Sequence, residues 1–213
     1  MNIQQMRQEY SAEPFDVSDA ADNPIEQFGR WFKEATEAEL PEPNAMVLAT
    51  VGEHGRPAAR VLLLKGFDKD GFVFFTNYNS RKGKELTHTP SAAMVFNWLE
   101  LQRQIRIEGS VVKISPDDST RYFQSRPKGS QIGAWASPQS QVIDSRALLE
   151  NTVDQLEEQY RQEDRLPRPE HWGGYLVRPT LVEFWQGRAS RLHDRLQYTL
   201  QDDGDWLIER LAP

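Results

Sequence analysis

Short apolar segments separated by turn residues make up most of this chain. Apolar residues run together or alternate with polar ones over lengths typical of strands, and turn signals such as Asp-Lys-Asp-Gly at 68–71 lie between them. The pattern predicts strands at 45–51, 59–65, 72–76, 91–98 and 102–114, and later at 174–177, 181–186, 191–199 and 205–211. Such a series favours a β-barrel or sandwich, closed by its C-terminal strands.

Helical periodicity appears between these strands. Asn23 and Pro24 suit an N-cap and a first helical position, and Phe28, Trp31 and Ala35 follow at helical spacing. Further helices are predicted at 80–89, 116–124 and 145–161. The segment that follows the helix at 116–124, up to residue 140, is expected to form a packed loop that suits a ligand wall. We therefore expect a mainly β domain with peripheral helices (α+β) at 23–213, preceded by a flexible N-terminal tail or lid at 1–22.

Composition narrows the functional classes. The chain has 213 residues, 38% of them hydrophobic, which suits one domain with a substantial core. A net charge of −7 argues against broad binding to nucleic acid or to a membrane surface, so any anion site must be a local basic pocket. The absence of cysteine excludes disulfides and thiolate chemistry, and no histidine pair has metal-ligand spacing. Without a signal-peptide pattern, a cytoplasmic protein is expected.

One candidate anion site is the sequence Arg-Leu-His-Asp-Arg at 191–195. If the chain is extended here, Arg191, His193 and Arg195 share one face of a strand. Three cationic or basic groups on one face repel each other unless an anion or acidic partner lies among them, and guanidinium suits phosphate or carboxylate. A solvated strand edge is the ordinary alternative.

Three further segments combine cations with hydrogen-bonding groups. Arg60 and Lys65 flank an apolar strand on opposite faces, although they also fit the polar ends of a core strand. Arg81 and Lys82 follow Ser80 at a predicted helix N-terminus, where backbone N–H groups favour a phosphate; an ordinary charged first turn is the alternative. The third segment holds an aromatic hydroxyl, a guanidinium and a serine around a Pro-Lys-Gly turn: Tyr122, Arg126 and Ser130.

Taken together, several motifs resemble the pyridoxine/pyridoxamine 5′-phosphate oxidase family. They are RVLLLK at 60–65, FFTNYNSRK at 74–82, SRPKGSQIGAW at 125–135, EFWQG at 183–187, RLHDR at 191–195 and the terminal RLAP at 210–213. They occur in the family's order and span most of the chain from about residue 25. The resemblance implies an FMN-binding split β-barrel and a homodimer that holds FMN at the subunit interface.

The resemblance also implies roles for individual residues. The implied FMN-binding set is Arg60, Val61, Leu62, Leu63, Leu64, Lys65, Phe75, Thr76, Arg81, Lys82, Gln104, Gln139, Ser140, Trp185 and Arg195. The implied substrate-binding set is Arg7, Tyr10, Lys65, Tyr122, Arg126, Ser130, Arg191, Leu192 and His193, of which Lys65, Tyr122, Arg126 and Ser130 meet the substrate phosphate. Arg191 and His193 are the implied catalytic pair, and no metal is implied.

The implied reaction oxidises pyridoxine 5′-phosphate or pyridoxamine 5′-phosphate to pyridoxal 5′-phosphate. The flavin would take a hydride equivalent and pass two electrons to O2, giving H2O2, with NH3 released from the amine. Leu176 departs from the family, which often has Arg there, so interface contacts or stability are expected to differ rather than chemistry. Two alternatives stay open: an oxidase of the phenazine-biosynthesis type, and a split barrel that carries or senses flavin, haem or pyridoxal phosphate. The residues do not identify a general base.

Overall fold

The computed structural model describes residue 3 and residues 9–213. Within them, nine strands form one antiparallel sheet with the order β2-β1-β5-β6-β7-β4-β3, and β8 and β9 extend it from β7. The strands are β1 Ala45–Val51, β2 Pro57–Leu63, β3 Gly66–Asp68, β4 Gly71–Asn77, β5 Ser91–Trp98, β6 Arg103–Lys113, β7 Trp172–Gln186, β8 Asp194–Leu200 and β9 Trp206–Arg210. The sheet curls into a half-barrel, and the expected split β-barrel is confirmed.

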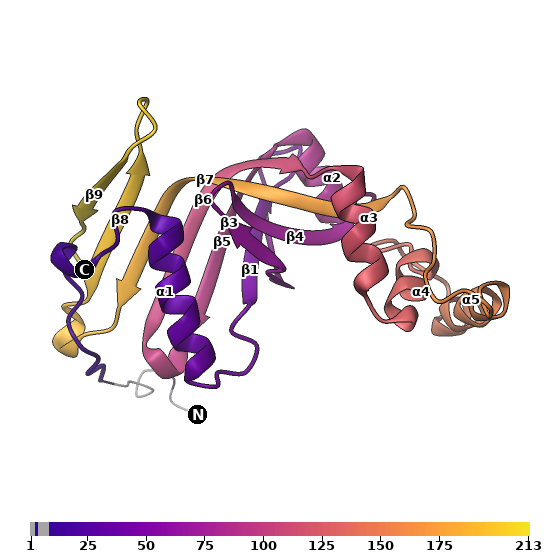
Figure 1. Cartoon of the computed structure of the whole chain (residues 1–213), viewed down its shortest axis with the longest axis horizontal. Coiled ribbons are helices and arrows are strands. Elements are labelled where there is room, and N and C mark those ends of the chain that lie inside the picture. The colour runs from indigo at the N-terminus through magenta and orange to yellow at the C-terminus, as the bar shows by residue number, and fades with distance from the viewer. Residues whose placement is uncertain (1–2, 4–8) are drawn as a thin grey trace.

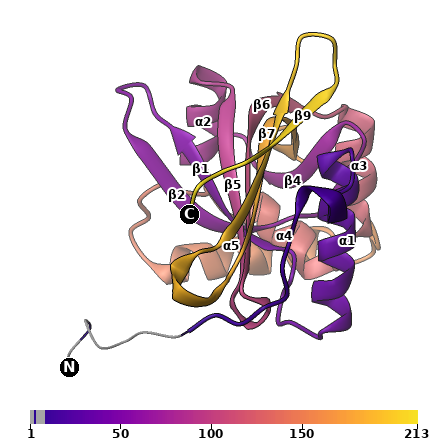
Figure 2. The ribbon, with the colours of Figure 1, turned by 90° about the vertical axis from the view of Figure 1, so that its left-hand side faces the viewer.

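β7 is the longest strand, and it divides the sheet. Its first half pairs with β4, its second half pairs with β8, and β6 runs along its other edge. Pro179 lies between the two halves, where the register with β6 shifts at Glu108 and Gly109. The sheet therefore splits at one edge, and the β8–β9 hairpin extends from the end of the molecule opposite α3, α4 and α5 (Figures 1 and 2).

Helix α1, Pro24–Glu37, covers the main core. Asn23 caps it by accepting a hydrogen bond from the amide of Ile25, as the sequence predicts. Phe28 is fully buried and meets Phe72 and Phe96 edge to face, with ring centroids 4.9 and 5.0 Å apart. The predicted apolar stripe of α1 thus joins the helix to the sheet.

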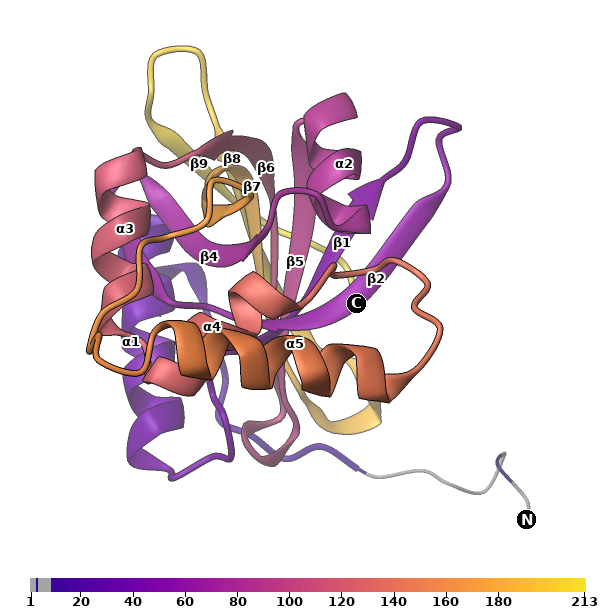
Figure 3. The ribbon, with the colours of Figure 1, turned by 90° about the vertical axis from the view of Figure 1, so that its right-hand side faces the viewer.

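A second, smaller core lies at the opposite end of the sheet. It is built from α3, Pro116–Ser125; α4, Lys128–Ala136; and α5, Arg146–Gln159. Phe123, Ile132, Leu166 and Trp172 are buried there, and α5 packs against α4 (Figure 3). Helix α2, Arg81–His88, packs instead on β1. This second core supports one wall of the pocket described below.

Two local predictions were wrong. The chain up to residue 140 is not all loop, because α4 forms within it; Gln131 stabilises this helix by bonding the carbonyl of Arg126 and the amide of Leu166. The strand predicted at 191–199 begins only at Asp194, because Ala189–Arg191 is a 3-10 helix in which Ser190 and Arg191 have φ of 56° and 62°. The predicted shared strand face of Arg191, His193 and Arg195 therefore does not form.

Residues 9–22 lie against the body of the protein. Phe15 and Ala21 are buried, and the amide of Phe15 donates to Asp194 at 3.1 Å. Whether residues 1–22 act as a flexible tail or lid stays a prediction, and Arg7 lies outside the described residues. Among the described helices, none is long and apolar enough to cross a membrane.

Candidate active site

A cavity of about 520 Å³ lies between β2, β4, α3 and α4. Ten predicted site residues line it: Val61, Leu62, Leu63, Lys65, Phe75, Thr76, Tyr122, Arg126, Ser130 and Gln139. Its other lining residues were not predicted: Asn77, Gly133, Ala134, Ser137 and Trp172. The described lining thus contains two cations, Lys65 and Arg126, and no Asp or Glu. On a protein with a net charge of −7, this cavity is a local basic site.

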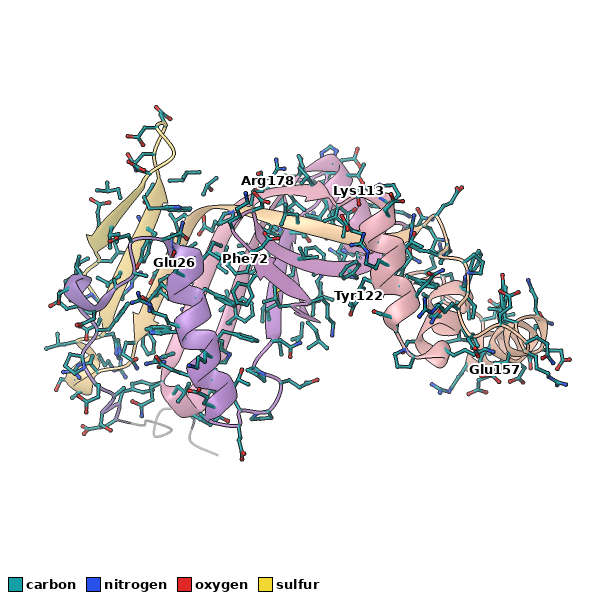
Figure 4. The ribbon with its side chains drawn as sticks, viewed as in Figure 1. Glu26, Phe72, Lys113, Tyr122, Glu157 and Arg178 are labelled. Carbon is teal, nitrogen blue, oxygen red and sulfur yellow. The ribbon has the colours of Figure 1, made fainter. Side chains whose placement is uncertain are left out.

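Three stacked rings form one wall of the cavity. Tyr122 projects from α3 toward β4 (Figure 4) and stacks on Phe75, with centroids 3.8 Å apart and planes 18° apart. Trp172 stacks on Phe75 at 5.4 Å. Close approach at the start of β7 requires glycine, because a Cβ on Gly173 or Gly174 would lie 2.1 Å from Tyr78 Oη or 2.5 Å from Ile114 Cδ1. The Trp-Gly-Gly sequence could have indicated this close packing.

Arg126 lines the cavity and carries an unpaired donor. Its guanidinium carbon lies 4.6 Å from the ring centroid of Trp172, and Nη1 is buried with no hydrogen-bond partner among the described residues. Burial lowers the pKa of Arg126 and raises the pKa of Tyr122, but an arginine remains charged at neutral pH. A buried donor without a partner is costly, so this atom fits an anionic ligand.

Lys82 is a second buried cation, and no carboxylate of residue 3 or residues 9–213 forms a salt bridge with it. In the first turn of α2, its Nζ donates to Thr76 Oγ1 at 3.2 Å and Gln139 Oε1 at 3.3 Å, and Ser80 Oγ lies at 3.5 Å. Burial, and then the charge of Arg60, lower the pKa of Lys82. Thr76 and Gln139 both line the cavity, so Lys82 lies directly behind its wall. Ser80 caps α2 as predicted, which gives a helix N-terminus beside a buried ammonium.

Arg60 and Arg81 share one carboxylate. Glu85 is buried and accepts from Arg60 Nη2 at 2.9 Å and from Arg81 Nε at 2.8 Å, and Thr50 donates to it as well. Burial opposes ionisation of Glu85, but these hydrogen bonds outweigh it and the pKa of Glu85 lies below its ordinary value. Arg60 therefore points toward β1 and α2, whereas Lys65 follows the end of β2 and lines the cavity.

The remaining predicted residues form a separate cluster on β7 and β8. Trp185 and His193 have ring centroids 4.5 Å apart, and Tyr10 meets both rings edge to face at 5.6 Å. Gln104 lies opposite Trp185 on β6, and Leu192 is 69% exposed. From Trp172 to Trp185, β7 extends about 40 Å at about 3.3 Å per residue. One protomer therefore does not bring this cluster into the cavity.

Hydrogen bonds fix the polar groups of this second cluster. The backbone N–H of Arg188 donates to His193 Nδ1 at 3.1 Å, so a neutral His193 ring has its proton on Nε2. Burial, and then the charge of Arg191, lower the pKa of His193, which favours that neutral ring. Arg195 donates to the buried carboxylate of Glu183 at 2.7 Å and to the carbonyl of Ala212 at 2.8 Å.

Three predicted residues lie in other surroundings. Leu64 is buried in the main core. Arg81 and Ser140 line a different cavity of about 400 Å³ beside Glu85.

Comparison with known proteins gives the class of this protein, an oxidoreductase of a flavoprotein family. Family models described as pyridoxamine 5′-phosphate oxidase and as the pyridoxine 5′-phosphate oxidase C-terminal dimerisation region match residues 32–160 and 172–213. The chain belongs to the pyridoxine/pyridoxamine 5′-phosphate oxidase family.

Relatives that carry the family name cover the whole chain. A pyridoxine/pyridoxamine 5′-phosphate oxidase of Salinibacter ruber is 58% identical, covering 98% of this chain and 97% of that protein. One from Cyanothece sp. is 56% identical, covering 100% and 99%.

Solved structures show the same fold. PhzG from Burkholderia lata 383, in complex with tetrahydrophenazine-1-carboxylic acid, has a TM-score of 0.88 at 33% identity and covers 95% of this chain and 100% of its own. An FMN-binding, pyridoxamine 5′-phosphate oxidase-related protein of Nostoc punctiforme has a TM-score of 0.71 at 22% identity, covering 90% and 98%. The second match supports the fold alone.

Proposed function

We propose that this protein is an FMN-dependent oxidase that converts pyridoxine 5′-phosphate or pyridoxamine 5′-phosphate to pyridoxal 5′-phosphate. The electron acceptor is O2, and the products include H2O2 and, from the amine, NH3. The protein would serve the biosynthesis and salvage of vitamin B6 in the cytoplasm.

The unpaired Nη1 of Arg126 carries this proposal. Lys65 and Arg126 supply two positive charges with no carboxylate in the described lining, which matches a phosphate monoester of about −1.5 to −2 at pH 7. Tyr122 and Ser130 add hydroxyl groups in the same cavity. A phosphate held here lies away from the reacting carbon, so its main effect is to fix the substrate's orientation.

The surroundings of Lys82 fit the phosphate of FMN. Arg60 and Arg81 share a single carboxylate, Glu85, and Lys82 forms no ion pair with a described residue. The three cations therefore exceed that one carboxylate by two positive charges beside the N-terminus of α2. Lys82 in particular is buried among neutral acceptors only. When bound, FMN supplies the two-electron chemistry between substrate and O2. The proposed contacts of the rest of FMN are Val61, Leu62, Leu63, Leu64, Lys65, Phe75, Thr76, Gln104, Gln139, Ser140, Trp185 and Arg195.

This set of contacts requires two protomers. Phe75 and Thr76 line the cavity, as does Trp172 at the start of β7. Trp185, near the end of β7, and its partner Arg195 on β8 lie about 40 Å along the strand from Trp172. The matched C-terminal dimerisation region covers residues 172–213, which include that part. We therefore propose a homodimer in which one copy supplies the cavity and the other supplies the cluster of Trp185, His193 and Arg195.

Arg191 and His193 are the proposed catalytic residues, and Leu192 between them is a proposed substrate contact. With Nδ1 occupied by the amide of Arg188, neutral His193 can donate through Nε2 to the substrate alcohol or amine. Arg191 stays protonated, so its role is to orient the substrate and stabilise negative charge rather than to remove a proton.

We also propose that residues 23–213 form the single catalytic domain and that residues 1–22 form a lid. Tyr10 packs on Trp185 and His193, which supports a lid over the catalytic residues. Arg7, the second proposed substrate contact of this segment, lies outside the described residues.

The test is aerobic turnover of the FMN-loaded protein with pyridoxine 5′-phosphate, scoring pyridoxal 5′-phosphate and H2O2 together. We expect both products in equal amounts and at least 100-fold lower kcat/KM for unphosphorylated pyridoxine, since two charge-assisted contacts to phosphate are each worth about 1.5–3 kcal/mol. Bound FMN without either product would contradict the proposal. Oxidation of a tetrahydrophenazine carboxylic acid in its place would assign the chain to the PhzG type.

A further inference from the structure

Trp172 lies beside two of the predicted phosphate-binding side chains, Arg126 and Tyr122. Its ring is 7% exposed, stacks on Phe75, and lies nearly parallel to the ring of Tyr122, at 6° and a centroid distance of 6.2 Å. The guanidinium carbon of Arg126 lies 4.6 Å from the centroid of the same ring. Trp172 thus touches the cation directly and shares a stack with the phenol.

We propose that Trp172 is the positioning residue for the substrate phosphate, because its ring holds the guanidinium of Arg126 while Nη1 has no hydrogen-bond partner among the described residues. This inference rests on the proposed function, in which Arg126 binds that phosphate. A guanidinium over an aromatic face is attracted by the ring's quadrupole, yet it keeps its full charge and its in-plane donors. A carboxylate in the same place would neutralise the charge that the phosphate needs.

The ring of Trp172 is itself held on several sides. Phe123 meets it edge to face at 5.3 Å, and the guanidinium of Arg168 donates to its backbone carbonyl. Next to Trp172, the backbone at Gly173 and Gly174 comes close to Tyr78 and Phe75, which leaves no room for a Cβ at either glycine. Arg126 therefore lies on a fixed surface and needs little reorganisation on binding an anion.

The ordinary alternative is that Trp172 only fills the second core, which includes Phe123, Ile132 and Leu166. The two roles predict different kinetics. A core-filling residue affects stability and every substrate alike, whereas a positioning residue affects only ligands that carry the phosphate. Trp135 provides a matched control, because it packs against the same core as Trp172. Its ring meets His171 rather than Arg126, and its Nε1 donates to the carbonyl of Pro167.

The experiment compares FMN-loaded wild-type, Trp172→Leu, Trp172→Phe and Trp135→Leu proteins. For Trp172→Leu we expect KM for pyridoxine 5′-phosphate to rise about tenfold, within the roughly 2–30-fold span of a cation–π contact, with kcat changed less than about threefold. Competitive inhibition by inorganic phosphate should weaken by the same factor, and the Kd of FMN should not change. Trp172→Phe should retain most of the affinity, and Trp135→Leu should match wild-type.

Three outcomes would overturn the inference. They are an unchanged KM in Trp172→Leu, an equal rise for unphosphorylated pyridoxine, and an equal rise in Trp135→Leu. If Trp172→Leu does not fold, Trp172→Met removes the ring while keeping a large apolar side chain, and the same rise is expected of it.

Failure of the proposed function is distinguishable from failure of this inference. If the wild-type protein has no turnover, calorimetric titration with pyridoxal 5′-phosphate replaces the KM measurement. Binding that is about tenfold weaker in Trp172→Leu than in wild-type would then support the inference, and equal binding or none in either protein would overturn it.

Discussion

Two groups of cationic side chains differ in what holds them. At the cavity, Arg126 lies on an aromatic ring and Lys82 bonds neutral oxygens. On β8 and β9, Arg195 pairs with Glu183, and Arg210 pairs with Asp194 at 2.8 Å. A carboxylate neutralises a cation and gives it a structural role, and we call such paired cations the scaffold group. A neutral contact also holds the cation in place, but its charge stays uncompensated and can attract an anionic ligand.

Arg60 and Arg81 are intermediate, because both depend on Glu85. The comparison therefore ranks the predicted binding residues. Arg126 and Lys82 should contribute mainly to ligand affinity, Arg60 and Arg81 to both affinity and structure, and Arg195 largely to structure through Glu183.

The largest effect is expected from Arg126→Ala. KM for pyridoxine 5′-phosphate should rise about 100-fold, which corresponds to about 3 kcal/mol for a lost charge-assisted contact, while kcat changes little. Steady-state kinetics with phosphorylated and unphosphorylated substrates checks this. Arg121→Ala is the control on the same helix, because Arg121 is exposed and paired with Asp118. An unchanged KM would remove Arg126 from the phosphate site.

A smaller effect, on kcat rather than on KM, is expected from Arg191→Met. Turnover should fall by roughly 30-fold, as expected for a residue that orients the substrate, while the Kd of FMN changes less than about threefold. Stopped-flow reduction and flavin fluorescence measure the two quantities separately. Arg146→Met, on the exposed face of α5, serves as the control. Loss of flavin in parallel with turnover would place Arg191 in the scaffold group instead.

Glu183→Gln tests the scaffold group. Glu183 is buried between Arg106 and Arg195, whose side chains are 41% and 25% exposed, so losing its charge should cost about 2 kcal/mol, less than a fully buried pair. A thermal melt should then show Tm lower by about 6 °C. Glu158→Gln removes an exposed pairing with Arg161 and should change Tm little. Equal effects of the two variants would contradict the distinction.

The smallest effect concerns the protonation of His193. Its pKa lies below the ordinary 6.5, so the unfolded chain binds the proton more tightly and folding stability should fall as pH drops from about 6.5 through the lowered pKa. An NMR titration of the ring should give a midpoint below 6.5. Arg191→Met should move that midpoint upward, because it removes a repelling charge; a midpoint that does not move would show that burial alone accounts for the shift.

Much of the fold could be predicted from local pattern. The bounds of β1 and β5 were predicted from short apolar segments between turn signals. The N-caps of α1 and α2 were predicted from Asn23, which precedes Pro24, and from Ser80. β7 was predicted as two strands, at 174–177 and 181–186, but it is one. Pro179 between them cannot donate to a ladder, and the structure accommodates it with a register shift in the pairing of β6 and β7. α4 depends on bonds from Gln131 to distant backbone, which no local pattern contains.

The candidate site could be predicted only in part, because it too depends on contacts between segments that are far apart in the sequence. Motifs identified the residues of the cavity one segment at a time, including Arg126 and Tyr122. The contribution of Trp172 arises from stacking with side chains of β4 and α3, so it is visible only in three dimensions. The separation of Trp185 from the cavity was equally hidden, because it depends on the unbroken length of β7.

The most direct test of the central claim is the affinity of the FMN-loaded protein for inorganic phosphate, measured as competitive inhibition in wild-type, Arg126→Ala and Glu183→Gln proteins. If cations without carboxylates are the ligand-binding ones, Arg126→Ala should weaken inhibition by at least tenfold, and Glu183→Gln should leave it within about twofold at a temperature where both are folded. Equal weakening in both variants, or none in Arg126→Ala, would contradict the account.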